Sequence, residues 1–124
     1  MVEEGIVLVS SRQGEPAHDM TSKSRKQQLQ EMLAEDPTDV FLRYGLAMEY
    51  ASAGEHAEAV CCFQDLIRDT PEYVPAYVQA GQLLARLGRD EEARSMFRAG
   101  IEAARKTGDL HAAGEMESFL EGLG

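Results

Sequence analysis

Gly54 lies midway along the stretch YGLAMEYASAGEHAEAVCCFQDLIRDTP, which runs from Tyr44 to Pro71, and separates two runs of small and large apolar residues. In both runs the apolar residues recur at intervals of about three or four positions, which is typical of an amphipathic helix. Glycine permits the positive φ of a turn between helices, and proline cannot continue a helix. The stretch therefore predicts two helices, one on each side of Gly54, with the second ending before Pro71.

The same pattern recurs further along the chain. Each residue of the first copy is separated from its counterpart by the same number of positions that separates Gly54 from Gly88, and we call this number the offset. An internal period of about 20–50 residues indicates a stack of repeated helix pairs. Small residues let the two helices of a pair approach closely, and large apolar residues then fill the space around the contact. The small residues expected at the contacts are Ala47 and Ala59 in the first pair and Gly81 and Ala93 in the second. The other residues that align at the offset are Pro37 with Pro71, Val40 with Val74, Ala51 with Ala85, Glu58 with Glu92, Phe63 with Phe97 and Ile67 with Ile101.

Helical segments flank the two pairs on both sides. Residues 22–35 are rich in helix formers and end at Asp36-Pro37, and residues 109–121 begin with Asp109 as a cap. Gly114 weakens the last segment by about 1 kcal/mol relative to alanine, so we expect a close helix contact there. The pattern as a whole predicts an all-α fold of about six helices.

Residues 1–20 differ from the rest, because glycine, proline and mixed polar residues interrupt any helical period. We expect them to form a flexible N-terminal tail. Within the tail, GIVLVSS is apolar enough to form a short strand or to dock in an apolar groove. The folded domain is predicted at 21–124, with full repeats at about 40–73 and 74–107 and the capping helix at 109–121.

The composition of the chain restricts the classes of partner and the cellular compartment that we expect. The 124 residues are about one domain, and 22 acidic against 12 basic residues give a formal net charge of -10, which repels nucleic acid and anionic membrane surfaces. The start MVEEGIVLVSS lacks the basic region of a secretory signal, and no segment approaches the roughly 20 apolar residues of a membrane span. Cys61 and Cys62 are adjacent, so a bridge between them would be strained. We therefore expect a soluble cytoplasmic protein with reduced thiols.

At these positions the chain resembles the tetratricopeptide repeat, a helix pair with the pattern Trp-x-x-Leu-Gly-x-x-Tyr followed by Gly, Ala, Phe, Ala and Pro. The resemblance covers Ser22 to about Gly108 and implies a right-handed α-solenoid of antiparallel helix pairs, with two full repeats, a flanking half repeat and a capping helix. The chain departs from the pattern at Arg43 in place of Trp, Leu66 in place of Ala and Arg105 in place of the second Pro. The matching residues are Leu46, Ala47, Tyr50, Gly54, Ala59, Phe63 and Pro71 in the first repeat, and Tyr77, Ala80, Gly81, Leu84, Gly88, Ala93, Phe97 and Gly100 in the second.

The resemblance also implies where a partner binds, because the first helix of each pair in this family lines a concave groove that holds a peptide or a helix. Mostly apolar or uncharged side chains take these positions here. Such a groove favours an apolar strand or helix, although apolar stripes at helical spacing also pack within a repeat, and both interpretations stay open for Tyr44 and Met48. The groove positions are Phe41, Tyr44, Met48 and Ser52 in the first repeat and Val78, Gln79, Gln82 and Arg86 in the second.

Relatives that clamp the acidic C-termini of heat-shock chaperones use Lys, Asn and Arg in this groove. Tyr44 and Met48 replace the Lys and the Asn. The sequence therefore disfavours a chaperone-tail clamp.

Motifs for catalysis or for binding a metal or cofactor are missing. His18, His56 and His111 are far apart, and no phosphate loop, dinucleotide-binding glycine pattern or nucleophile elbow occurs. Cys61 or Cys62 could act as a nucleophile only with a lowered thiol pKa. We therefore expect a protein that is not an enzyme and needs no cofactor.

Two hypotheses about function remain. The first is a non-enzymatic module that binds a peptide or helix of a partner protein in the groove. The alternative is self-association, in which the groove holds the segment GIVLVSS of the same chain or of a second copy as a weak homodimer.

Overall fold

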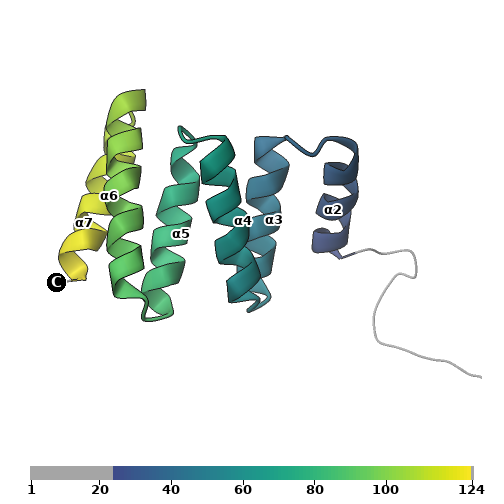
Figure 1. Cartoon of the computed structure of the whole chain (residues 1–124), viewed down its shortest axis with the longest axis horizontal. Helices are drawn as coiled ribbons and strands as arrows, with labels where there is room; N and C mark the ends of the chain where they lie inside the picture. The colour runs from purple at the N-terminus through teal and green to yellow at the C-terminus, as the bar shows by residue number, and fades with distance from the viewer. Residues whose placement is uncertain (1–23, 124) are drawn as a thin grey trace, which may run out of the picture.

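The computed structural model describes residues 24–123, and within them the chain forms six helices and no strand. The helices lie side by side in chain order, with α7 against α6 at the far end from α2 (Figure 1). The expectation of an all-α stack of helix pairs is confirmed. The tail 1–20 and its segment GIVLVSS lie outside the described residues. The helices are α2 (Arg25–Glu35), α3 (Val40–Ser52), α4 (His56–Asp69), α5 (Val74–Arg86), α6 (Asp90–Thr107) and α7 (Leu110–Gly122).

Local sequence sets the ends of the helices. Gly54 and Gly88 have φ of 80° and 78°, in the left-handed region where a side chain would be strained, so they turn the chain between the helices of each pair. Ser24 caps α2 by accepting a hydrogen bond from the backbone N–H of Gln27, whose side chain bonds back to the Ser24 N–H. Asp109 caps α7 by accepting from the backbone N–H of Ala112.

Small residues form the contacts within each pair, as expected from the repeat. Ala47, Ala59 and Ala93 are fully buried, and a Cβ at Gly81 would lie 2.4 Å from Cε1 of Phe97. α3 packs on α4, and α5 packs on α6. The small size of these residues therefore sets the spacing of the helices, and large apolar residues fill the space around the contacts.

The helix α7 packs on both α6 and α5. Phe119 of α7 stacks on Phe97 with 5.4 Å between the ring centroids, and a Cβ at Gly100 would lie 2.5 Å from Sδ of Met116. The expected close contact at Gly114 is wrong, because a Cβ there would meet no atom within 4 Å. The small residue at the contact between α6 and α7 is instead Gly100 of α6.

Ion pairs hold the first helices together. Arg25 Nε of α2 lies 2.9 Å from Glu49 Oε2 of α3, and Lys26 Nζ lies 2.7 Å from Oε1 of Glu55, which precedes α4. These pairs are partly exposed and add only modest stability, whereas the buried side chain of Leu29 packs α2 on α3 at Gly45.

Candidate protein-binding groove

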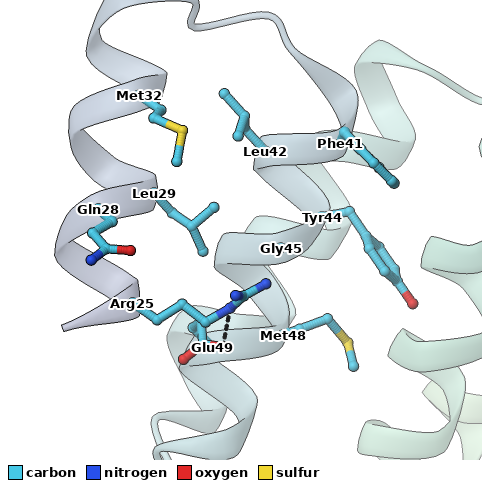
Figure 2. Close-up of a pocket in the computed structure, with 10 residues that line it drawn as sticks. All are labelled: Arg25, Gln28, Leu29, Met32, Phe41, Leu42, Tyr44, Gly45, Met48 and Glu49. Atoms are coloured by element: carbon cyan, nitrogen blue, oxygen red, sulfur yellow. Dashed lines mark ion pairs between the residues drawn. The ribbon is translucent and has the colours of Figure 1, made fainter.

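A cavity of about 410 Å³ lies between α2 and α3, and we call it the α2–α3 cavity. Gly45 of α3 lies at its centre, with side chains of α2 on one side and the side chains of Phe41, Tyr44 and Met48 on the other (Figure 2). Phe41 is 78% exposed and Met32 is 48% exposed, so the cavity has an open apolar rim. The lining residues are Arg25, Gln28, Leu29, Met32, Phe41, Leu42, Tyr44, Gly45, Met48 and Glu49.

A second cavity of about 140 Å³ lies between α3 and α5, and we call it the α3–α5 cavity. Apolar residues of three helices and the polar groups of Ser52, Gln79 and Arg86 line it. Met48 lines both cavities, so the two adjoin along α3. We call the two together the groove. The lining residues of the second cavity are Met48, Ala51, Ser52, Phe63, Gln79, Leu83 and Arg86.

Most of the residues predicted for a groove lie in these two cavities. Val78 is only 9% exposed and Gln82 is half-buried, and neither lines the groove. The remaining predicted residues line the groove. Phe41, Tyr44 and Met48 line the α2–α3 cavity, and Met48, Ser52, Gln79 and Arg86 line the α3–α5 cavity.

Tyr44 belongs both to the packing of the repeat and to the groove wall. Its ring meets the rings of Phe63 and Tyr73 edge-on, with centroids 6.1 Å and 5.5 Å away. Burial, and next the neighbouring Tyr73, raise the pKa of its phenol above the ordinary value. Tyr44 is therefore a fixed wall of the groove, because aromatic contacts hold its ring in place.

Sequence reasoning missed the contribution of α2. Leu29 and Met32 line the α2–α3 cavity, and Arg25 lines it as the partner of Glu49. The prediction considered only the first helix of each pair, whereas α2 stands in the place of a second helix. The apolar face of Leu29 and Met32 was visible in the sequence and could have identified them.

The charge of the groove differs from that of the chain. No acidic residue lines the α3–α5 cavity, although the chain carries 22 of them. The exposed guanidinium of Arg86 has no ion-pair partner within residues 24–123, and the Ser52 hydroxyl and Gln79 amide add further hydrogen-bond donors. In the α2–α3 cavity, by contrast, Arg25 and Glu49 neutralise each other.

The described part of the chain offers little support for metal binding or for a cysteine nucleophile. No group of three His, Cys, Asp or Glu side chains within it could hold a metal ion. Burial, and next the charge of Asp65, raise the pKa of the Cys62 thiol, which disfavours the thiolate that a nucleophile needs. Cys62 is half-buried and Cys61 is exposed. None of the six helices is both long and apolar enough to cross a membrane.

Comparison with known proteins agrees with this architecture. The family model of the tetratricopeptide repeat matches residues 74–107. TPR repeat-containing protein PA0015 of Pseudomonas aeruginosa is 30% identical over 95 residues, which cover 77% of this chain and 90% of that protein.

Solved structures with the same fold include relatives of this chain and more distant proteins. A tetratricopeptide repeat domain protein from Salinibacter ruber, solved by solution NMR, matches with a TM-score of 0.67 and 32% identity over 70% of this chain and 88% of that one. The TPR2B domain of yeast Sti1, in a complex with pHsp70, matches with a TM-score of 0.73 over 79% of this chain and 78% of that one, but at 17% identity it shows the fold alone. The helix pairs, the constant period that relates Gly54 to Gly88 and the relatives from two bacteria show that the chain belongs to the tetratricopeptide repeat family.

Proposed function

We propose that the chain is a non-enzymatic protein-binding module that holds a peptide or a helix of a partner protein in the groove. The observation that carries this proposal is that the two cavities share Met48 as a lining residue, with Phe41 and Met32 exposed on the rim. Exposed apolar residues that gather around a hollow are typical of interaction sites, whereas scattered ones are ordinary. Methionine at the junction suits partners of different shapes, because its side chain is flexible and polarisable.

The family and the fold support this function. A structure with the same fold, the TPR2B domain of Sti1, holds pHsp70 in its complex. The groove of this chain differs from a clamp for acidic C-termini at Tyr44 and Met48, which offer apolar contact. We therefore propose a partner segment that buries apolar side chains against Phe41, Tyr44 and Met48 and places polar groups near Gln79 and Arg86.

The proposal is tested by selecting binding peptides from a displayed random library on the immobilised full chain, followed by calorimetry on synthetic copies of the selected peptides. We expect the change Met48→Gln to weaken binding about tenfold, because a polar amide then replaces an apolar contact shared by both cavities. The matched control is Leu110→Gln, because Leu110 is 71% exposed and lines neither cavity. Failure to select any peptide, or equal losses at both positions, would overturn the proposal.

Self-association through the groove is the second candidate. The exposure of Met32 and Phe41 on adjoining helices favours it, because a second copy could cover both. Light-scattering mass across a concentration series distinguishes the candidates. A mass that doubles with concentration, and stays monomeric in the variant Phe41→Ser, would place self-association first.

A further inference from the structure

We infer that the α2–α3 cavity is the seat of an amphipathic α-helix supplied by another protein, which docks where residues 24–123 place no helix of the repeat. This inference rests on the proposed function and specifies the kind of partner. It follows from the repeat itself, because the chain contains a second, occupied copy of the same surface.

The offset that relates Gly54 to Gly88 also relates the α2–α3 cavity to a surface formed by α4 and α5. Along α2, the cavity residues map onto the face of α4 that packs against α3. Along α3, they map onto positions of α5 from Pro75 to Leu83. The correspondences that matter are Arg25 with Ala59, Leu29 with Phe63, Met32 with Leu66, Tyr44 with Val78 and Glu49 with Leu83.

In the occupied copy, a helix covers this surface. Ala59, Phe63 and Leu66 of α4 are all at most 1% exposed, and α3 packs against α4. The ring of Tyr44 from α3 reaches Phe63, with 6.1 Å between the centroids. The element that occupies the equivalent of the α2–α3 cavity is therefore α3 itself, a helix of 13 residues.

In the open copy, no described residue covers the surface, and although Leu29 is buried, other side chains remain partly in solvent. Met32 is 48% exposed, whereas its counterpart Leu66 is fully buried. Gly45 faces α2, because a Cβ there would lie 3.5 Å from the side chain of Leu29, and so it belongs to the contact between α2 and α3.

The chemistry of the seat defines the partner. Arg25 and Glu49 pair with each other, so the cavity does not require a charged group on the ligand. Apart from Gln28, the rest of the lining is mostly apolar, with methionines at Met32 and Met48. By analogy with α3, which packs through Val40, Tyr44 and Ala47, the docking helix presents apolar residues at positions i, i+4 and i+7.

The chain's own sequence before α2 is poorly suited to supply this helix. The same offset, counted back from α3, leads to residues 6–18, which contain Gly14 and Pro16. Proline and glycine are the two residue types that destabilise the interior of a helix most. These residues lie outside the described part of the chain, and their composition favours a helix from another protein.

The test uses a fluorescent reporter at the seat. The chain has no tryptophan, so Phe41→Trp in the full chain places a single indole on the rim of the cavity. The probe is the acetylated and amidated peptide of residues 39–53, held helical by a lactam bridge on the face opposite Val40, Tyr44 and Ala47. We expect a saturable blue shift of the emission, and binding at least about tenfold weaker for the same peptide with Ala47→Pro, which breaks the helix.

A matched pair of variants locates the binding. In the reporter background, Met32→Glu should weaken binding at least about tenfold, because docking would bury an unpaired charge, and Met32→Gln should weaken it less. Leu110→Glu adds the same charge at an exposed leucine outside the groove and should leave affinity within about twofold.

Three outcomes would overturn the inference. The helical and the proline-containing peptides could bind equally, which would assign the seat to an extended segment. The full chain could dimerise in a way that Met32→Glu abolishes, which would assign the seat to a second copy. The helical peptide could also fail to bind at all. If selected peptides still bind in a manner that depends on Met48, the proposed function stands even when the helix seat fails.

Discussion

The backbone of Gly81 in α5 lies directly against the ring of Phe97 in α6, and a Cβ at residue 81 would lie within 2.7 Å of three ring atoms. Phe97 is almost completely buried, so its ring has little room to move aside. Alanine would gain about 1 kcal/mol in helix propensity, but overpacking a fixed core, backbone shifts included, costs about 1–3 kcal/mol. We expect Gly81→Ala to lower the free energy of unfolding by up to about 2 kcal/mol, measured by urea denaturation. An increase would contradict the close contact.

The opposite effect is expected at Gly114, which lies inside α7 with open space where a Cβ would be. Gly114→Ala should raise the free energy of unfolding by about 0.5–1 kcal/mol, because helix propensity improves without a clash. The same urea experiment checks it, with Gly81→Ala as the paired comparison. A loss of stability would show that α7 packs more tightly at this position than the structure shows.

The hydroxyl of Tyr77 donates a hydrogen bond of 2.7 Å to the carbonyl oxygen of Pro71, and so ties α5 to the loop that separates the two repeats. Tyr77→Phe keeps the ring and removes this bond, so we expect a loss of about 0.5–1.5 kcal/mol in thermal or urea unfolding. Tyr73→Phe is the control, since the Tyr73 hydroxyl has no hydrogen-bond partner within residues 24–123, and it should change stability by less than about 0.5 kcal/mol.

Acid should weaken the link between α3 and α4. Arg43 Nη2 lies 3.0 Å from Asp69 Oδ2, and this hydrogen bond holds the pKa of Asp69 below its ordinary value. A carboxyl whose pKa is lower in the folded state stabilises the fold above its unfolded pKa, and that contribution is lost as the pH falls through the folded value. We expect the stability of the wild type to fall more steeply below about pH 4 than that of Asp69→Asn. Equal slopes in denaturant titrations from about pH 2 to 6 would contradict the ion pair.

The repeat made most of the fold predictable from the sequence. Gly54 and Gly88 marked the turns, and Ala47, Ala59 and Ala93 marked the contacts between paired helices, because few residue types are compatible with either position. The end of the stack was less predictable. A glycine inside a helix can serve a close contact or simply be tolerated, and only the neighbours of Gly100 and Gly114 in space tell the two apart.

The groove was predictable in position but not in shape. The family pattern identifies which helix faces the groove, and it found Phe41, Met48 and Arg86. It does not give the sizes of the side chains opposite, which decide that Val78 is buried whereas Tyr44 is shared between core and groove. The α2–α3 cavity depends on how α2 packs on α3, where Leu29 lies against Gly45 and Arg25 pairs with Glu49, and such a contact between helices is not encoded by spacing along the chain.

The central claim, that the groove binds a partner segment, is tested most directly by methionine-methyl NMR of the full chain titrated with a peptide selected on it. Four methionines lie in the described part of the chain, with Met32 and Met48 in the groove and Met96 and Met116 outside it. We predict that the Met48 methyl signal shifts and saturates with the peptide, together with Met32 when the ligand reaches the α2–α3 cavity. Saturable shifts confined to Met96 and Met116 would contradict the claim.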